Sequence, residues 1–325
     1  MVATLLAEAC ERRRALGLPS GDTDAFRLVH AAADGIDGLT VDVYGRHLVA
    51  SLYTEAYGER EQQWIAACAE LGYDGVYLKR RPRQANEVAP SERRDRAPER
   101  AIAGQDAAPM LIVHEAAQPF EVRLGDGFST GLFLDQRDNR ARVAHEASGK
   151  SVLNLFAYTC AFGAVAAAHG ARRTVNIDVA KGVLERGRRN YELAGVAVAE
   201  EASAHQFLAR DVLDALPRMA NKSERYDLVV LDPPSYASTR GRRFSVERDY
   251  PELVALAIAL VAADGSLLAC TNHQKLQERD LSRAISQAAR SAGRSVRQLE
   301  FVPPPPDHPS LAGRAAHLKS VWIRL

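Results

Sequence analysis

The chain lacks several features that would assign it to particular classes of protein. Its 325 residues include no apolar run long enough to cross a bilayer. The amphipathic segment from Met1 to Arg14 lacks the apolar core and small-residue cleavage site of a secretion signal. The cysteines are scattered and form no metal-type pair: Cys10, Cys68, Cys160 and Cys270. A globular protein of the reducing cytoplasm, away from membranes, is the simplest interpretation.

The chain also carries little net charge. Its formal net charge is +1 at pH 7, so it lacks the strong overall basicity of many nucleic-acid binders. Basic residues gather only locally, in the run from Lys79 to Arg83 and at Arg93, Arg94 and Arg96. A solvated loop is the first interpretation of each cluster, and a phosphate-facing patch is the alternative.

The first part of the chain reads as a small α+β domain. Residues 1–25 hold a helix, and a domain over residues 26–125 follows, in which strand-like segments surround a second helix. The polar segment 81–104 has no periodicity and is expected to be a mobile loop. The expected helices are 5–16 and 59–71, and the expected strands are 26–30, 39–44, 47–53, 75–78, 110–114 and 120–124.

From Lys150 onward, strand-like and helical segments alternate. This rhythm predicts an α/β fold with a parallel or mostly parallel sheet and helices on both faces, within a domain over residues 126–325. The expected strands are 152–156, 174–177, 207–209, 227–231, 266–270, 296–301 and 320–323. The expected helices are 160–169, 181–194, 251–261 and 278–292.

The most informative motif is Asp232-Pro233-Pro234-Ser235-Tyr236, which follows the apolar run from Leu228 to Leu231. A β-branched run that ends in an acid and two prolines predicts a buried parallel strand stopping at the carboxyl edge of a sheet. The prolines stiffen the loop, and ligands of open α/β sheets bind at that edge. The alternative is a plain strand-ending turn, because Asp-Pro often starts turns.

Polar groups follow the ends of three further strands. The first strand contains Asn154 and leads into a helix N-terminus without the pattern Gly-x-Gly-x-x-Gly, which argues against a pyrophosphate-containing cofactor. Asp178 ends the next strand and suits hydrogen bonding to ribose hydroxyls, while Asp211 can accept from an adenine amino group. Each acid alone can simply cap a helix. Together they point to S-adenosylmethionine, which has ribose and adenine but no pyrophosphate and carries an activated methyl group.

These motifs resemble those of a known family. The run Ser129–Arg140, the segment Leu153–Thr159 and the strand-end acids are similar to the ribosomal-RNA large-subunit methyltransferases, from about Phe26 to the C-terminus. The family includes an RlmI-like cytosine-C5 group and an RlmK-like guanine-N7 group. The resemblance implies a Rossmann-like class I methyltransferase sheet, S-adenosylmethionine as cofactor and RNA, specifically 23S rRNA or an assembling large subunit, as substrate. Asp307-His308-Pro309 and Leu318-Lys319 also resemble the family's C-terminal signature.

The strand ends and the resemblance together define the expected site. Arg137 is expected near the methionine carboxylate, with a surface salt bridge as the alternative. The expected cofactor-binding residues are Phe133, Asp135, Arg137, Asn154, Phe156, Tyr158, Thr159, Asp178, Val179, Asp211, Val212 and Asp232. The expected catalytic residues are Asp232, Pro233, Pro234, Tyr236 and Asn272, with Cys270 as a further candidate.

The sequence departs from the family pattern in two places. Many RlmI-like members begin with an RNA-binding PUA domain, and the roughly 25 residues before the central domain are too few for one. RNA binding is then expected from the small domain, the arginine-rich loop or a partner. The second departure concerns the nucleophile, because methylation of cytosine C5 needs a thiolate that adds to C6. Asn272 occupies the position at which the family's cysteine is expected, and Cys270 lies about two positions before it. A small core residue is the other interpretation of Cys270.

The segment Thr271–Lys275 fits the guanine-N7 group better. Guanine N7 has its own lone pair, so its methylation needs no thiolate. Asn272 can hydrogen-bond a base edge and Tyr236 can stack on the base, although Asn272 can equally cap a loop. The sequence leaves open a methyltransferase for a small molecule or a protein, a non-catalytic RNA-binding protein, and a homodimer.

Overall fold

A computed structural model describes residues 2–53, 58–81, 90–198, 204–239, 242–273, 275–311 and 313–325. The chain divides into two compact units. The first unit comprises Met1–Arg137 and Pro305–Arg314, and the second comprises Asp138–Pro304 and Ala315–Leu325. The chain therefore passes from one unit to the other and back near its C-terminus.

The first unit is built on a mixed sheet with the strand order β1-β2-β3-β4-β5, in which β3 and β4 run parallel and the other pairs antiparallel. Helices α1 and α2 pack their apolar residues, such as Leu6 and Trp64, against this sheet. A separate hairpin, β6–β7, follows. The elements are α1 (Val2–Ala15), β1 (Ala25–His30), η1 (Ala31–Asp34), β2 (Leu39–Tyr44), β3 (His47–Tyr53), α2 (Glu59–Ala69), β4 (Gly75–Arg81), α3 (Pro90–Arg96), β5 (Ala103–Gly104), β6 (Leu111–Glu115), β7 (Gln118–Val122) and η3 (Leu134–Gln136).

The second unit is built on a larger sheet with the order β10-β9-β8-β11-β14-β16-β15. Strands β10 to β14 of this order are parallel, while β16 is antiparallel to both β14 and β15. The elements are α4 (Arg137–Glu146), β8 (Ser151–Leu155), α5 (Ala161–Ala168), β9 (Arg173–Asp178), α6 (Lys181–Leu193), β10 (His205–Ala209), α7 (Val212–Asn221), β11 (Tyr226–Leu231), β12 (Tyr236–Thr239), β13 (Arg242–Ser245), α8 (Val246–Ile258), β14 (Val261–Thr271), α9 (Glu278–Ser291), β15 (Gln298–Val302) and β16 (Lys319–Arg324).

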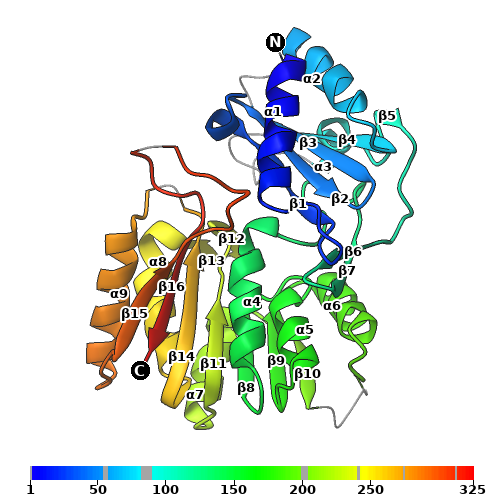
Figure 1. The fold of residues 1–325 in the computed structure, drawn as a ribbon. Coiled ribbons are helices and arrows are strands. Elements are labelled where there is room, and N and C mark those ends of the chain that lie inside the picture. Colours follow the sequence, from blue (N-terminus) through cyan, green and yellow to red (C-terminus); the bar gives the residue numbers. More distant parts are fainter. Residues whose placement is uncertain are drawn as a thin grey trace. The chain divides into compact units, whose positions relative to one another are not determined.

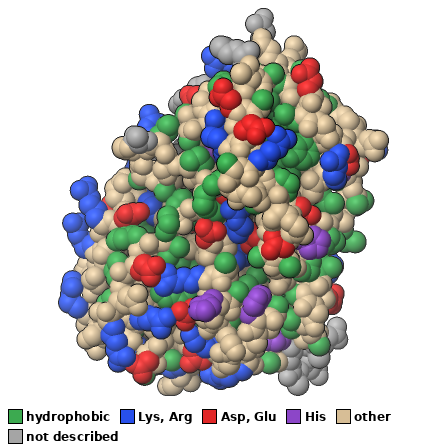
Figure 2. Space-filling view, in the orientation of Figure 1, with side chains coloured by type: hydrophobic (Ala, Val, Ile, Leu, Met, Phe, Trp, Pro, Cys, Tyr) green, Lys and Arg blue, Asp and Glu red, His purple; other side chains and the backbone are tan. Residues whose placement is uncertain are grey.

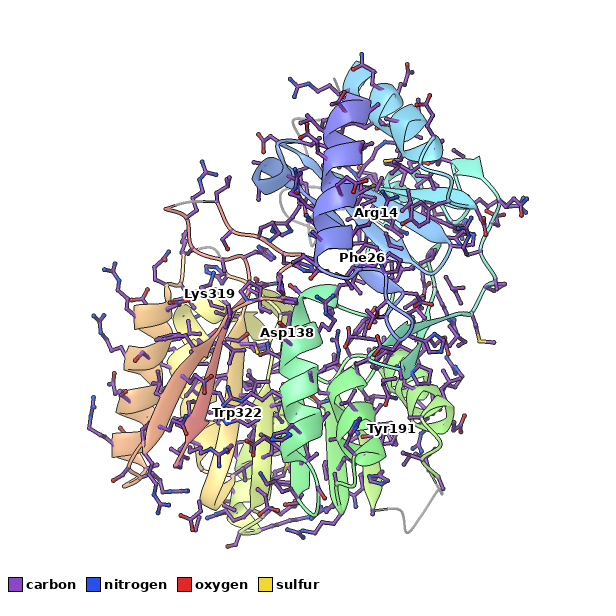
Figure 3. The ribbon with its side chains drawn as sticks, viewed as in Figure 1. Arg14, Phe26, Asp138, Tyr191, Lys319 and Trp322 are labelled. Carbon is purple, nitrogen blue, oxygen red and sulfur yellow. The ribbon has the colours of Figure 1, made fainter. Side chains whose placement is uncertain are left out.

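Helices cover both faces of this sheet (Figure 1). Successive strand residues point to opposite faces, so each strand contributes to two cores. Leu153 and Leu155 of β8 join one core with residues of α7, α8 and α9. Val152 of the same strand joins the other core with residues of α4 and α5, which also contains Trp322 of β16 (Figure 3). The predicted α/β class, the mostly parallel sheet and the helices on both faces are therefore confirmed.

The first unit differs from the sequence expectations in two respects. The first unit extends to Arg137 and includes residues 305–314, whereas the sequence suggested a boundary near residue 125. The expected mobile loop over 81–104 contains α3 and β5, and residues 82–89 lie outside the described part of the chain. Helix α3 is polar all round, so it shows no apolar stripe by which a helix is recognised.

Two helices of the second unit were not expected. Helix α7 buries Val212, Ala215, Leu216 and Met219 at helical spacing, but it contains Pro217, which reads as a helix breaker in a sequence. Helix α4 is strongly polar, and Val143 is its one residue in the apolar cluster on that face of the sheet. In both, tertiary packing outweighs a weak local pattern.

Candidate active site

The ends of four parallel strands meet at one edge of the second unit's sheet. In the strand register Leu155 of β8 lies level with Ile177 of β9 and with Leu231 of β11, and Ala209 of β10 lies level with Asp178. The residues that directly follow these strands therefore share the carboxyl edge. Asp178, Asp211 and Asp232 all lie there, as the sequence suggested. Such an edge is the usual ligand-binding position of an open α/β sheet.

The loop from β8 to α5 has an unusual backbone. Phe156, Tyr158 and Cys160 have φ values of 56°, 49° and 57°, in the left-handed region that side chains other than glycine rarely adopt. Each such residue costs about 1–3 kcal/mol and persists only where surrounding contacts enforce it. Strain of this kind is concentrated at functional sites. Two of the three residues are among those expected to bind the cofactor.

Asp178 supplies part of the enforcing contact. Its Oδ2 accepts the backbone N–H of Tyr158 at 2.9 Å and its Oδ1 accepts the backbone N–H of Ala180 at 3.0 Å. A carboxylate has about four acceptor positions, so two such bonds leave capacity for ribose hydroxyls. The neighbouring Val179 is a large apolar side chain that is 52% exposed at this edge. Asp178 thus ties the β8–α5 loop to the end of β9.

Asn154 lies inside the sheet rather than at its edge. The side chain is buried, and its Nδ2 donates to Asn176 Oδ1 at 3.0 Å. Asn176 in turn donates to the hydroxyl of Tyr191, a residue of α6, at 2.8 Å (Figure 3). Asn154 therefore belongs to a buried hydrogen-bond network. The expected role of Asn154 in cofactor binding stays a prediction.

Gly163 of α5 packs directly on this network. A Cβ atom at this position would lie 2.1 Å from Asn176 Oδ1 and 2.4 Å from the Tyr191 hydroxyl. Only glycine therefore allows α5 to approach β9 and α6 as it does. Thr159, just before the helix, is likewise buried, and its carbonyl accepts from Asn190 at 2.8 Å.

The third strand end has a structural partner of its own. Asp211 is the N-cap of α7, where its Oδ1 accepts the backbone N–H of Leu213 at 2.9 Å. Val212 is buried in the core below. The capping alternative for Asp211 is thus present in the structure, and contact with adenine stays a prediction for both residues.

The loops after β11 and β14 are joined by a hydrogen bond. Ser235 Oγ donates to Asn272 Oδ1 at 2.6 Å. Pro233 is buried and Pro234 is exposed, so the diproline has one face in the protein and one in solvent. The structure therefore brings together two of the expected catalytic segments, Asp232–Ser235 and Asn272. The side chain of Tyr236 lies outside the described part of the structure.

Cys270 lies in the core. Its side chain is fully buried and packs with Leu268 and Trp322, and Asn139 Nδ2 lies 3.8 Å from its sulfur. Asn272, two residues later, is exposed beyond the end of β14. This placement favours the interpretation of Cys270 as a small core residue over that of a nucleophile.

The remaining expected residues belong to the first unit. Phe133 is 50% exposed, and Asp135 lies in the short helix η3. Arg137 pairs in a bidentate manner with Asp307, at 2.6 and 3.1 Å. Asp307 is fully buried and also accepts the backbone N–H of Arg27 at 2.9 Å.

Arg137 does form a salt bridge, as the alternative interpretation had it, but the bridge is not on the surface, because the Arg137 side chain is 14% exposed and Asp307 is fully buried. Contact of Arg137 with the methionine carboxylate stays a prediction. Burial alone would raise the pKa of Asp307, but the neighbouring His308, whose Nδ1 lies 3.4 Å from Oδ1, and the bidentate Arg137 hold it well below the usual range. The sequence analysis missed this contact because 170 residues separate the partners. The resemblance of Asp307-His308-Pro309 to a family signature was the available hint.

The comparison with known families decides the identity of the chain. The family model of S-adenosylmethionine-dependent methyltransferases matches residues 30–324. The chain belongs to this family. The recognised family, the Rossmann-like class I fold and the cofactor S-adenosylmethionine are thereby confirmed.

Individual relatives agree with this assignment. A ribosomal RNA large subunit methyltransferase from Deinococcus radiodurans is 32% identical over 99% of this chain and 78% of its own length. A ribosomal RNA large subunit methyltransferase I from Aeromonas salmonicida is 32% identical over 87% of this chain and 70% of its own length. Among solved structures, the methyltransferase SMU.776 in complex with SAH has a TM-score of 0.84 at 27% identity, covering 100% of this chain and 81% of that one.

The strand-end edge of this methyltransferase is chemically suited to its cofactor. Asp178 has spare acceptor capacity, Val179 offers exposed apolar surface, and the β8–α5 loop presents a constrained backbone.

Among the described residues, no three or more His, Cys, Asp or Glu side chains are grouped to hold a metal ion. No helix in the described ranges is long and apolar enough to cross a membrane.

Proposed function

We propose that this methyltransferase transfers a methyl group to a base of large-subunit ribosomal RNA, and that the acceptor is guanine N7. Two relatives that are 32% identical are named for the large ribosomal subunit's RNA. Their names state no acceptor atom, so the choice between guanine N7 and cytosine C5 rests on the surroundings of the site residues.

The observation that carries the choice is the burial of the cysteines. Transfer to cytosine C5 requires a thiolate within reach of the base. Cys270, the cysteine nearest in sequence to the expected nucleophile, is fully buried in the core. Burial raises the pKa of Cys160 well above its ordinary value and that of Cys68 to about 12, and it also raises the pKa of Cys10. Guanine N7 needs no thiolate, so it is the acceptor that these surroundings support.

The proposed base contacts come from the two joined loops. The Ser235 hydroxyl holds Asn272 by donating to its Oδ1, and the Asn272 amide NH2 would donate to an acceptor on the base edge. Asp232, Pro233 and Pro234 form the stiff wall of this position, and Tyr236 is proposed to stack on the base. These residues would align the acceptor nitrogen with the methyl group, which is the main catalytic requirement.

The cofactor contacts are proposed along the same edge. Asp178 would accept from the ribose hydroxyls, and Val179 would cover one face of the adenine ring. When bound, S-adenosylmethionine supplies a methyl group on a positively charged sulfur. We propose further contacts from the backbone of the β8–α5 loop, including Phe156 and Tyr158.

The test compares ribosomal RNA from cells with and without this protein. Nucleosides from large-subunit RNA are quantified by mass spectrometry, and loss of 7-methylguanosine is the expected result. Loss of 5-methylcytidine instead would replace the acceptor in this proposal. An unchanged nucleoside profile, together with labelled methyl transfer to cell extract depleted of RNA, would favour a small-molecule or protein substrate.

A further inference from the structure

Helix α9 presents a row of exposed arginines on the second unit. The side chains of Arg279 and Arg283 are 81% and 75% exposed, and Arg290 is also exposed. At about 100° per residue, these three positions fall within about 40° of one another around the helix. They span about 16 Å along its axis. We call these three residues the α9 arginine face.

This face lies opposite the side by which α9 is anchored. The helix packs Leu281, Ile285, Ala288 and Ala289 into the core. Those positions centre about 200° around the helix from the arginines. The arginines therefore point away from the sheet, and Figure 2 shows Lys and Arg side chains along the edge of the molecule where α9 lies. No packing role accounts for them.

Helix stability accounts for only one of them, Arg290, which lies in the last turn, where the helix dipole favours a positive charge. Arg279 lies in the first turn, where the helix dipole disfavours a positive charge. Arg279 and Arg283 are four residues apart, a spacing at which like charges repel. Asp280 lies 4.0 Å from both, but it is also engaged in the capping box through the backbone N–H of Gln277 at 3.0 Å. Arg279 and Arg283 are thus placed where the electrostatics of the helix disfavour a positive charge.

The position of the face relates it to the site. Helix α9 begins at Glu278, shortly after β14 ends at Thr271, so its N-terminal end lies at the carboxyl edge of the sheet. The exposed Asn272 lies in the connection between them. The arginine face therefore starts near the proposed base contact and runs from there along the outside of the unit.

We propose that the α9 arginine face binds the phosphate backbone of the RNA strand whose base is methylated. This inference rests on the proposed function and names a surface for its substrate. Guanidinium groups are suited to phosphates because they donate in a planar fork. Contacts of this kind position the strand without reading its sequence, while the residues at the strand ends select the base.

The experiment measures RNA binding and methyl transfer separately. The test variant is Arg279→Gln/Arg283→Gln/Arg290→Gln in the full chain. The matched control is Arg218→Gln/Lys222→Gln/Arg225→Gln, which removes three exposed positive charges near the amino edge of the same sheet. A third variant, Arg279→Lys/Arg283→Lys/Arg290→Lys, keeps the charge. The probe is in-vitro transcribed large-subunit rRNA, titrated at several salt concentrations.

The expected result is specific to the test variant. Its RNA affinity falls about tenfold or more, and the slope of log K against log salt decreases by about 2, as for three phosphate contacts to a single strand. KM for RNA rises while kcat and S-adenosylmethionine affinity stay as in the wild type. The control stays near the wild type, and the lysine variant recovers most of the binding.

Two results would overturn the inference. A test variant that keeps the wild-type salt slope and KM shows that the face does not contact RNA. An equal loss in the control shows that only total charge matters. If the wild type binds RNA with the expected slope but transfers no methyl group to it, the proposed function fails while the surface stands.

Discussion

Replacement of Asp178 tests whether one carboxylate both holds the β8–α5 loop and binds the cofactor. In Asp178→Asn one oxygen remains and can keep the bond from the half-buried Tyr158 N–H, while the solvent-exposed bond from Ala180 is lost. One such bond contributes about 1 kcal/mol net, so the free energy of unfolding should fall by about that amount. In Asp178→Ala both bonds are lost, and the fall should reach about 2–4 kcal/mol.

In Asp178→Asn, the loss of free energy of cofactor binding should be larger than the loss of free energy of unfolding. Because the single oxygen of Asn at position 178 accepts the Tyr158 N–H, no charged acceptor is left for a ribose hydroxyl. A hydrogen bond to a charged group contributes about 1.5–3 kcal/mol, which corresponds to roughly 10- to 100-fold in the dissociation constant. Isothermal titration calorimetry with S-adenosylmethionine measures this loss, and thermal unfolding of the same samples measures stability.

Asp227→Asn is the matched control for this experiment. Asp227 accepts both the backbone N–H and the hydroxyl of Ser151 at 2.8 Å, and Arg172 at 2.7 Å, but it lies at the start of β11 on the opposite edge of the sheet. It should lose comparable stability and keep wild-type cofactor affinity. Wild-type affinity in Asp178→Asn would refute the assignment of Asp178 to the cofactor site. Unchanged stability in Asp178→Ala would refute its role in holding the loop.

Three further substitutions test other parts of the argument. Cys270→Ala should lower stability by about 1–2 kcal/mol through a small cavity, yet retain most methyl transfer to rRNA; abolished transfer in a folded variant would point to cytosine C5. Gly163→Ala should lower thermal stability markedly, because its Cβ would overlap Asn176 Oδ1 at 2.1 Å, and an unchanged melting temperature would contradict that close approach. Burial lowers the pKa of Lys79 to about 8, so the unfolded chain binds more protons between about pH 8 and 10.5 and wild-type stability should gain up to about 3 kcal/mol there relative to Lys79→Met. Parallel pH profiles of unfolding for these two proteins would contradict the burial of the charge.

The sequence was most informative where local pattern and burial coincide. The apolar run Leu228–Leu231 before Asp232 identified a strand because a strand buried on both faces requires continuous apolar residues, whereas the strand before Asp178 alternates the polar Thr174 and Asn176 with Val175 and Ile177. The acids at their ends then predicted a common edge, since parallel strands point the same way. The run Ser129–Arg140, the segment Leu153–Thr159 and the strand-end acids indicated the family.

Tertiary contacts decided which partners these residues have in the folded protein. The sequence could not show that Asp178 receives the Tyr158 N–H, because the left-handed backbone at Tyr158 is imposed by packing rather than by residue type. Nor could it assign Arg137 to Asp307, whose partner lies 170 residues away and is recognisable only after folding. Long-range pairing carries no local pattern.

By itself, then, the sequence determined the parallel strands and four of the helices of the second unit, the acids at the sheet edge and the family, because these depend on local periodicity and on motif spacing. Only the tertiary structure decided that Cys270 is enclosed in the core while Asn272, two residues on, is exposed beside Ser235. That difference depends on where β14 ends and on which helices cover its two faces. Burial is a property of the packed layers, and here it supports the proposed guanine N7 acceptor over cytosine C5.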